Sequence, residues 1–382
     1  MIFVLVVCIV TVLYAYLGYP LFLFLATKLF SKKASGNGGD YTPDVTVVIA
    51  VHNEEKNILN RLNDLTLQNY PGEKIEVVVV SDGSTDKTVS LVNQFKESNN
   101  LKLKILELKP NQGKPNALNT AVKVAEGDVL VFTDARQVFD VNVISELVSN
   151  FVDPRIGCVS GELFFKQSHD SNIHQEMGLY WKYEKYIRKS ESVLGSVVGV
   201  TGAIYAMRKE LYKAIPVNTL IDDVLIPMNV VMQGYRVLFD EKAMAYDVVS
   251  NDAGQEWKRK VRTLSGNWQL LLDHMCLLNP FRNSIFFQFV SHKVLRLIVP
   301  FLLMIILLVS FILSNDGYLW LFVLQLIIYG VIAVSFMFPQ VRKYRIINLM
   351  YFFTVLNAAA VVSFYKVIIC RQTNLWQAAY KK

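Results

Sequence analysis

Cysteine is scarce in this sequence of 382 residues, which contains four. Cys8, Cys158, Cys276 and Cys370 show none of the close spacings by which Cys and His side chains bind zinc, so we expect free thiols. Two further patterns are missing. No GxGxxG sequence opens a strand–helix unit, which disfavours a dinucleotide site. No Ser-His-Asp set or Cys-His pair stands at a recognisable spacing, which disfavours hydrolysis through a covalent intermediate.

Charge is missing from the start of the chain. The stretch Met1–Thr27 contains no charged side chain, and a membrane-spanning helix needs about 20 apolar residues. A cleaved signal peptide would begin with a positive segment, but Lys28, Lys32 and Lys33 follow the apolar run instead. We therefore expect a retained anchor, with the N-terminus outside and the residues after Lys28 in the cytoplasm.

Three more apolar runs, Leu297–Leu313, Tyr318–Phe338 and Ile346–Ile369, are each long enough to span a bilayer. Hydrophobic residues make up 53% of the chain, and the mean hydropathy is +0.32. The sequence thus predicts an integral protein of the plasma (inner) membrane with a cytoplasmic domain. The expected parts are an N-terminal transmembrane helix (1–28), a cytoplasmic domain (29–275), an amphipathic interface helix (276–293), three transmembrane helices (294–370) and a tail (371–382).

The net charge of +7 comes from basic residues that cluster beside the apolar runs. This distribution fits anionic lipid headgroups and phosphate-bearing substrates better than a nucleic acid. No basic face with interleaved aromatic residues is typical of a nucleic-acid groove reader. We therefore expect the lipid bilayer as a partner and no nucleic acid.

Short apolar stretches at 45–51, 77–80, 103–108 and 129–132 alternate with helical patterns in the cytoplasmic part. This alternation predicts an α/β domain with a doubly wound, mainly parallel sheet. Ligands of such sheets bind beyond the carboxyl ends of the strands. Asp82 and Asp134 stand at such ends, and Asp223 precedes an apolar helix. A plainer interpretation of Asp82 is a loop residue that caps the next helix.

Carboxylates in these places suit a chemistry of phosphates and a hydroxyl group. Carboxylates beside a nucleoside diphosphate can share a divalent cation, and a carboxylate near an acceptor hydroxyl can remove its proton. Lys114, Arg259 and Arg262 could neutralise the charge of a departing diphosphate. The alternative for these three residues is an ordinary solvated basic face.

Several motifs together resemble one family. The stretches are VTVVIAVHNEE, VVVVSDGSTD, NQGKPNALN, GDVLVFTDAR, VGVTGAIYAMRKEL and IDDV, within residues 45–266. This region resembles the GT-A glycosyltransferases of family 2, in the membrane-integrated branch that includes hyaluronan, chitin, cellulose and poly-N-acetylglucosamine synthases. The resemblance implies a GT-A-type mixed sheet and a membrane-bound inverting transferase that uses a UDP-sugar and Mg²⁺ or Mn²⁺. It also implies a glycan acceptor and a role in extracellular or cell-surface polysaccharide synthesis.

The resemblance also implies roles for single residues in nucleotide-sugar binding, in catalysis and in acceptor binding. The predicted nucleotide-sugar residues are Ala50, His52, Glu54, Asp82, Lys114, Asp134, Arg136, Arg259 and Arg262, with Asp134 also holding the metal. Asp223 is the expected catalytic base, with Asp222 beside it. Gly199, Thr201, Gly202, Trp257 and Trp268 are expected on the acceptor side.

Two departures from the family pattern leave alternatives open. Arg136 replaces the second Asp of Asp-x-Asp and offers a cation no acceptor, so either Asp134 holds the metal with phosphate oxygens and water or Arg136 contacts phosphate itself. In the place of Gln-x-x-Arg-Trp the chain reads RKVRT, which keeps Arg262 but puts Thr263 where the synthases have Trp. Trp257 or Trp268 could substitute.

Three functions therefore remain open: polymer synthesis, a single transfer onto a lipid-linked acceptor, and a non-catalytic membrane subunit that binds nucleotide-sugar. A homo-oligomer is compatible with each of them.

Overall fold

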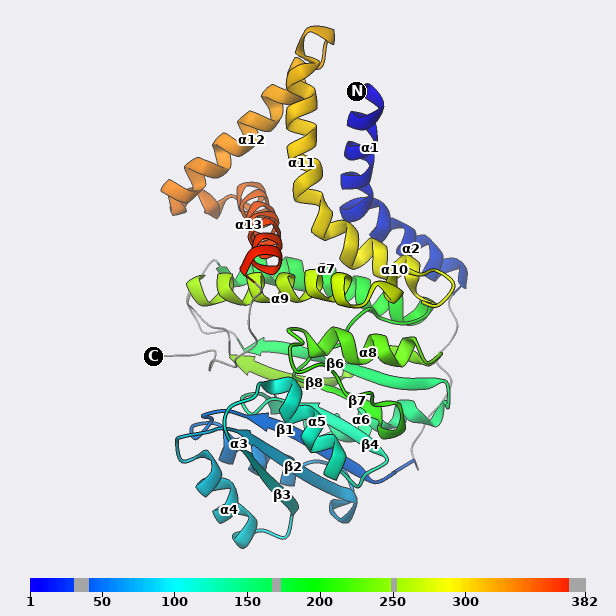
Figure 1. The fold of residues 1–382 in the computed structure, drawn as a ribbon, viewed down its shortest axis with the longest axis vertical. Helices are drawn as coiled ribbons and strands as arrows, with labels where there is room; N and C mark the ends of the chain where they lie inside the picture. The colour runs from blue at the N-terminus through cyan, green and yellow to red at the C-terminus, as the bar shows by residue number, and fades with distance from the viewer. Residues whose placement is uncertain (31–40, 167–172, 249–252, 371–382) are drawn as a thin grey trace.

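A mixed sheet of eight strands forms the core of an α/β domain, and long helices extend from one side of it (Figure 1). The structure is a computed structural model and describes residues 1–30, 41–166, 173–248 and 253–370. The order of the strands is β3-β2-β1-β4-β7-β6-β8-β5. They comprise Val45–Val51 (β1), Ile75–Asp82 (β2), Lys102–Leu108 (β3), Val129–Thr133 (β4), Val138–Phe139 (β5), Ile156–Lys166 (β6), Tyr205–Arg208 (β7) and Arg236–Val248 (β8).

The first half of the sheet is parallel. β1 pairs with β2 on one side and with β4 on the other, and β3 extends the parallel half beyond β2. Every residue of β1, β2 and β4 is buried, as β-branched runs covered on both faces require. The doubly wound α/β fold class predicted from these runs is confirmed.

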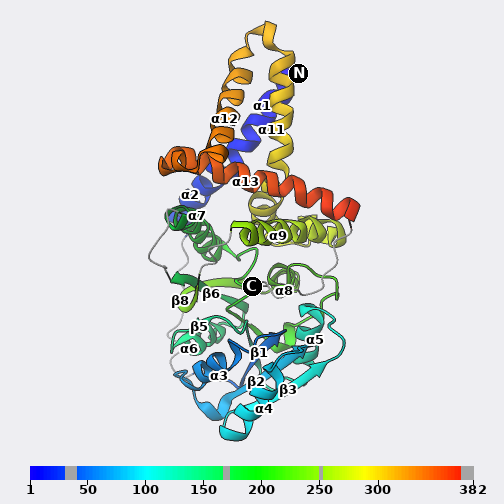
Figure 2. The same cartoon turned by 90° about the vertical axis from the view of Figure 1, so that its left-hand side faces the viewer.

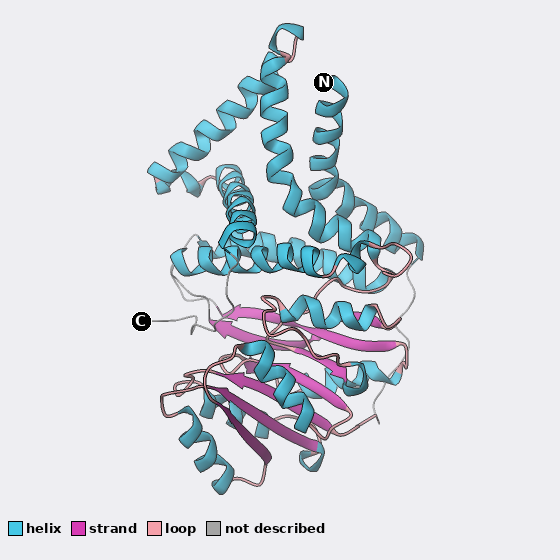
Figure 3. Ribbon diagram, in the orientation of Figure 1, coloured by secondary structure: helices cyan, strands magenta, loops and turns pink. Residues whose placement is uncertain are grey.

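The second half is mixed. β7 lies antiparallel between β4 and β6, and β8 runs parallel to β6 (Figure 3). The short strand β5 closes the edge antiparallel to β8. Because β4 and β6 are both antiparallel to β7, they run in the same direction. Their carboxyl ends therefore lie at one edge of the sheet and their amino ends at the other.

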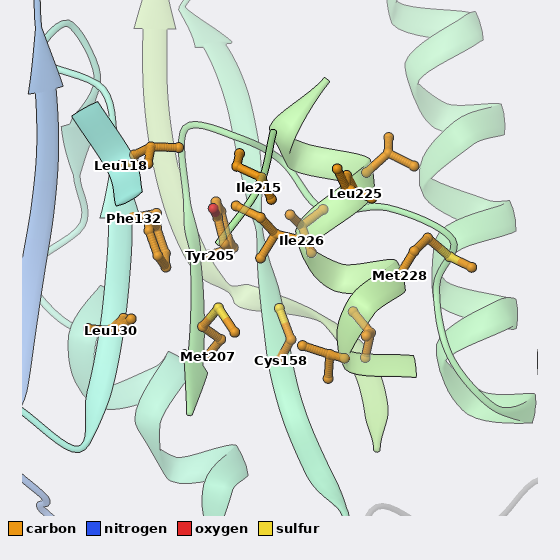
Figure 4. Close-up of a cluster of buried hydrophobic side chains, with 14 of the residues drawn as sticks. Leu118, Leu130, Phe132, Cys158, Tyr205, Met207, Ile215, Leu225, Ile226 and Met228 are labelled. Carbon is orange, nitrogen blue, oxygen red and sulfur yellow. The ribbon is translucent and has the colours of Figure 1, made fainter. Parts of the chain in front are cut away.

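Helices cover both faces of the sheet. One face is covered by α5 (Lys114–Val124) and α8 (Asp222–Val231), and the other by α3 (Ile58–Thr66), α4 (Thr88–Ser98) and α6 (Val143–Ser149). Under α5 and α8, Phe132 of β4 stacks on Tyr205 of β7 with ring centroids 4.6 Å apart (Figure 4).

Two helices lie between the sheet and the apolar helices: α7 (Ile173–Leu194) and α9 (Ala253–Asp273) (Figure 1). Ile187 of α7 packs against Tyr19 and Leu23 of the N-terminal helix. The hydroxyl of Tyr19 also donates a hydrogen bond of 2.7 Å to Glu191 of α7. The helix α7 thus docks directly on the first apolar helix.

Four helical runs are long and apolar enough to cross a membrane. They are Ile2–Phe30, which contains α1 (Ile2–Leu13) and α2 (Tyr19–Phe30), Phe286–Ile312, which contains α10 (Phe286–Phe289) and α11 (Leu295–Ile312), Leu319–Met337 (α12) and Arg345–Ile368, which contains α13 (Arg345–Tyr365). Their number and their composition agree with the predicted membrane association.

The separate interface helix expected at 276–293 is absent from the described residues. A single short turn occupies Met275–Leu278, and the chain from Phe286 continues through α10 into α11 as one helical run. The expected boundary between 293 and 294 therefore falls inside a helix. The expected tail, 371–382, lies outside the described residues.

The last apolar helix differs in direction from the others. In Figure 2, α13 lies across the group, above α9, whereas α1, α11 and α12 extend away from the domain. The buried residues of α13 are small or polar, whereas large apolar side chains such as Ile346 and Leu349 are exposed. This segment is long and apolar enough to span, as predicted, and it differs from the other three in its direction.

Candidate active site

A lysine joins two carboxylates at the carboxyl edge of the sheet. β1 has parallel neighbours on both sides, and ligands of open α/β sheets bind beyond such a point. Asp134 follows β4 directly, and Lys114 is the first residue of α5. The Nζ of Lys114 lies 2.9 Å from Oδ1 of Asp134 and 3.6 Å from Oδ2 of Asp222. Residues from three separate elements thus meet, as the sequence predicted.

The charge of Lys114 is fixed by these contacts. Burial acts to lower the pKa of this lysine, but Asp134 and Asp222 outweigh burial and raise the pKa above its ordinary value. Lys114 therefore stays positive throughout the physiological range. A permanent cation in this position can attract a phosphate group.

Asp223 stands beside Asp222 in the first turn of α8. Burial and the neighbouring Asp222 raise the pKa of Asp223 to about 6, against the opposing influence of Lys114, Lys293 and Arg262. A carboxylate that titrates close to neutral pH is suited to accept a proton from a substrate and to release it afterwards. Burial and the neighbouring charges thus give Asp223 a pKa that is compatible with a general base, and that role stays a prediction.

The loop 199–203 packs against Asp223. The backbone N–H of Val200 donates to the carbonyl oxygen of Asp223 at 2.9 Å. A Cβ on Gly202 would lie 3.2 Å from the Cβ of Asp223, so a side chain there would crowd the carboxylate. Arg188 of α7 donates to the hydroxyl of Thr201 at 2.9 Å. Gly199, Thr201 and Gly202 thus lie on one side of Asp223, and their acceptor role stays a prediction.

Asp82 is fully buried, and it holds the loop that leads into Lys114. Its two carboxylate oxygens accept the backbone N–H groups of Gln112, at 2.7 Å, and Gly113, at 2.8 Å. Its carbonyl oxygen accepts a hydrogen bond from Nδ1 of His52 at 2.7 Å. In this structure Asp82 positions the start of α5, and the contact with uracil or ribose stays a prediction.

The plainer interpretation of Asp82, a cap for the next helix, is wrong. Asp86 fills that role, because its Oδ1 accepts the N–H of Thr88, the first residue of α4, at 3.0 Å. Asp82 instead ties together the ends of β1 and β2 and the loop before α5. The turn that follows requires Gly83, which has a φ of +67° and no room for a side chain.

Ala50, His52 and Glu54 lie where β1 ends. Ala50 is buried in the core, and His52 is committed to the loop of Asp82. Glu54 is half-buried. Its pKa is raised by burial and further by the charge of Asp134, while Asn57 and Arg136 act to lower it. Glu54 and Asp134 therefore share one part of the site, and a nucleotide contact by these residues stays a prediction.

Arg136 binds a carboxylate of its own chain. Its Nε and Nη2 donate to Asp247 of β8 at 2.9 Å and 2.6 Å. The guanidinium in the place of the second Asp is thus held against the neighbouring strand by a bidentate pair. This contact gives no support to our expectation that Arg136 contacts phosphate.

The aromatic residues of α9 lie in different surroundings. The indole of Trp268 donates to the carbonyl oxygen of Ala360 at 3.3 Å and meets the rings of Phe301 and Phe364 edge-on. The ring of Trp268 thus packs between α11 and α13, and its acceptor-side role stays a prediction. Trp257 is half-buried at the other end of α9.

The two arginines of α9 are both exposed, but they differ in their neighbours. Arg259 pairs with Glu256 at 3.6 Å, one turn away on the same helix. Arg262 is close enough to Asp223 to lower its pKa. Of the two predicted phosphate contacts on α9, Arg262 is thus the one that lies near the carboxylates.

Sequence patterns did not identify three residues near Asp223. Lys293 lies at the start of an apolar run, where a lysine is usually a membrane-surface anchor. Arg188 lies in the helix α7, and Tyr205 lies in the strand β7; neither is among the predicted site residues. Their proximity to Asp223 comes from the packing of distant segments, so a local motif could not have revealed it.

The site has one feature that suits a divalent cation. Among the described residues, no group of three or more His, Cys, Asp or Glu side chains is arranged to hold a metal alone. Asp134 remains 38% exposed in its side chain. Mg²⁺ is usually bound through one or two carboxylates together with substrate phosphates. Asp134 therefore fits a cation that arrives with a diphosphate.

The comparisons with known proteins agree with this geometry. The family model described as Glycosyl transferase family 2 matches residues 46–215. The poly-beta-1,6-N-acetyl-D-glucosamine synthase of Staphylococcus aureus (strain COL) is 27% identical over 237 residues, which are 61% of this chain and 57% of the relative. The Staphylococcus epidermidis synthase is 24% identical over 232 residues, 60% of this chain and 55% of the relative. The aligned part thus spans little more than half of these relatives.

A solved structure extends the likeness to the whole chain. The mannosyltransferase PcManGT from Pyrobaculum calidifontis, in complex with GDP-Man and Mn2+, covers 97% of this chain and 100% of its own, with a TM-score of 0.73 and 22% sequence identity. At this identity the likeness concerns the fold, including the apolar helices. The family match shows a glycosyltransferase domain of family 2 in residues 46–215, distantly related to the poly-beta-1,6-N-acetyl-D-glucosamine synthases.

Proposed function

We propose that this enzyme transfers a sugar from a UDP-sugar to a membrane-held acceptor, with inversion, as a step in cell-surface polysaccharide synthesis. The observation that carries the proposal is the meeting of Asp134, Lys114 and Asp222 beside Asp223. The synthase relatives support the polysaccharide role and the N-acetylglucosamine donor class.

The donor side is built around phosphate. Lys114, which stays positive, and Arg262 neutralise charge on the diphosphate as it departs. Asp134 would hold Mg²⁺ or Mn²⁺ together with the phosphate oxygens, as a single protein ligand. The cation, when bound, supplies further neutralisation of the leaving diphosphate. The fold relative solved with Mn2+ supports this cofactor class.

The acceptor side is built around Asp223. Its carboxylate takes the proton of the acceptor hydroxyl while that oxygen forms a bond to the anomeric carbon. The bond between the anomeric carbon and the diphosphate oxygen breaks, its electron pair leaves with UDP, and the configuration inverts. The loop 199–203 fixes the acceptor sugar against this carboxylate. Positioning of the two substrates contributes much of the rate.

A single transfer onto a lipid-linked acceptor is the second candidate, and one observation favours it. Processive synthases of the branch hold the growing chain on a Trp, which is Thr263 here. Trp268, one of two substitutes, is occupied in packing against Phe301 and Phe364. Loss of a stacking platform weakens the hold on a polymer between successive additions.

The topology that we propose places the α/β domain on the cytoplasmic side of the membrane. Lys28 follows the first apolar run, and Arg342, Lys343 and Arg345 precede the last one. Positive residues of this kind are retained on the cytoplasmic side. This side is also where nucleotide-sugars are available.

The test is a donor screen with the purified full-length enzyme in lipid nanodiscs. Release of nucleoside diphosphate is measured with UDP-N-acetylglucosamine, UDP-glucose and GDP-mannose, each with Mn²⁺, with Mg²⁺ and with chelator. We expect release from a UDP-sugar that depends on the cation. Preference for GDP-mannose would overturn the donor assignment.

Product size separates the acceptor candidates. Mass analysis of the lipid extract and of the aqueous phase distinguishes one added sugar on a lipid from a long polymer. Tight UDP binding without transfer to any membrane acceptor would overturn the catalytic proposal in favour of a non-catalytic subunit.

A further inference from the structure

A cavity of about 640 Å³ lies between α2, the end of α7 and α10. Its walls are mainly apolar. They include Phe22, Leu25 and Leu29 of α2 and Phe287 of α10. Cavities of roughly 300–1,000 Å³ are of the size that holds small molecules. An acyl chain is the kind of group that such walls accept.

The cavity belongs to the membrane-facing part of the molecule. Its α2 wall is the second half of the run Ile2–Phe30, which is apolar and long enough to span a bilayer. Leu25 and Leu29 are 52% and 76% exposed, so the same helix also presents apolar surface to its surroundings. Lys28 ends the uncharged run and marks the level of the headgroups.

Two arginines, Arg155 and Arg236, complete the lining. Nε and Nη2 of Arg236 donate to the carbonyl oxygens of Gly195 and Ser192, each at 2.9 Å. Nε and Nη2 of Arg155 donate to Asp153. Within the described part of the chain, the Nη1 groups of both arginines have no hydrogen-bond partner. The two guanidinium groups are also close enough that Arg155, together with burial, lowers the pKa of Arg236.

The cavity is separate from the active site. Arg155 directly precedes β6 and Arg236 begins β8, so both lie at the amino edge of these strands. Asp134 follows the carboxyl end of β4, which runs in the same direction as β6. The arginines and the carboxylates thus occupy opposite edges of the sheet, and a ligand in the cavity is neither donor nor acceptor.

We propose that this cavity binds an anionic phospholipid of the surrounding membrane. One acyl chain lies along α2 between Leu25 and Phe287, and the phosphate accepts hydrogen bonds from the free Nη1 groups of Arg155 and Arg236. Arginine suits this task because its planar guanidinium donates to phosphate and is only weakly hydrated. Asp153 balances one of the two positive charges, and the remaining positive charge at this end of the apolar cavity favours an anionic headgroup.

The test measures lipid binding by native mass spectrometry of the full-length protein in detergent. The probes are phosphatidylglycerol and phosphatidylcholine with the same acyl chains. We expect phosphatidylglycerol to bind more tightly. Arg155→Gln should weaken its binding about fivefold and reduce the preference, because one basic side chain near a headgroup contributes a factor of that order. Lys123→Gln, which removes an exposed charge on α5, should leave binding unchanged.

A second variant tests the apolar part. Ala26 lines the cavity and is 8% exposed, so Ala26→Phe places a ring inside it. We expect Ala26→Phe to weaken the binding of both lipids. Thermal unfolding checks that the variants are folded.

Two results would overturn the proposal. One is equal binding of both lipids, with Arg155→Gln and Ala26→Phe behaving like the parent. The other is competition by soluble glycerol phosphate at the same concentration, which would assign the arginines to a free phosphate. Neither measurement uses a sugar donor, so failure here is distinct from failure of the proposed transferase reaction.

Discussion

The donor and acceptor halves of the site are stabilised in different ways. On the donor half, the carboxylates of Asp82 and Asp134 accept hydrogen bonds of 2.7–2.9 Å from backbone N–H groups and from Lys114. On the acceptor half, Asp223 forms no ion pair within the described part of the chain, and burial beside Asp222 governs its protonation.

This difference matches the two tasks. A diphosphate site needs charges fixed before the substrate arrives, because reorganising them would consume binding energy. A base needs a carboxylate that can change its protonation state during each cycle. The direct hydrogen bonds of Asp82 and Asp134 fix charges in advance, as a diphosphate site requires. Asp223 is partly buried and has cations only at longer range, so it can change its protonation state.

The largest effect is expected from a substitution on the proposed acceptor half. Asp223→Asn removes the proton acceptor, so kcat should fall by about 10²–10⁴, while the Kd for UDP-sugar changes little. Diphosphate release and isothermal titration measure the two quantities. Asp273→Asn, on an exposed residue of α9, serves as the control. Turnover equal to that of the parent enzyme would refute the assignment of Asp223.

Asp134→Asn should mainly affect the binding of the metal ion. The loss of one carboxylate should raise the concentration of Mn²⁺ needed for half-maximal activity by about tenfold or more, because metal binding depends on ligand charge. A titration of activity with Mn²⁺ measures this. An unchanged requirement would mean that Asp134 does not hold the cation.

A backbone change tests how rigid the donor half is. Gly83→Ala should destabilise the fold by about 1–3 kcal/mol, because Gly83 has a φ of +67° and a Cβ there would lie 2.8 Å from the backbone N of Asn111. Gly72→Ala is the matched control, since nothing lies within 4 Å of a Cβ at that position. Thermal unfolding compares the two, and equal melting temperatures would contradict the prediction.

The pH dependence sharpens the comparison. Below the pKa of about 6 the carboxyl group of Asp223 is protonated and cannot accept a proton. Activity should therefore fall about tenfold per pH unit below 6 and level off above it. The same raised pKa favours folding at low pH, and that contribution is lost as the pH rises through 6. Asp222→Asn removes a negative neighbour and so lowers the pKa of Asp223. The acid-side fall of kcat/KM should therefore move to lower pH. If the acid-side fall of kcat/KM stays at the same pH in this variant, the titrating group is not Asp223.

The smallest effect concerns Tyr205. Its hydroxyl is buried and has no hydrogen-bond partner in the described part of the chain. Tyr205→Phe should leave the stability unchanged or raise it slightly, since an unsatisfied polar group is removed. Activity should also stay within about twofold. A large loss of activity with normal folding would show that the hydroxyl takes part in the reaction.

The sequence predicted the parallel half of the fold well, because buried β-branched runs such as VTVVIAV carry a local signal. The turn residues that follow them identified Asp134 and Lys114 for the same reason. The pairing of Arg136 with Asp247 and the packing of Trp268 on α13 join residues far apart in the chain, and no local pattern reports them. The family model itself ends at residue 215, before Asp222 and Asp223. The acceptor half therefore depended on a short motif alone.

The helix α7 has a mechanical consequence. One side of it is bound to the N-terminal apolar helix through Tyr19 and Glu191, and another reaches the acceptor loop through Arg188 and Thr201. A helix moves largely as a rigid body, so a shift of α2 in the bilayer is carried to the loop beside Asp223. Under the proposed topology, the thickness of the surrounding lipid would thus affect the position of the proposed acceptor loop, whereas the proposed donor side is held by Asp82 through the loop before α5.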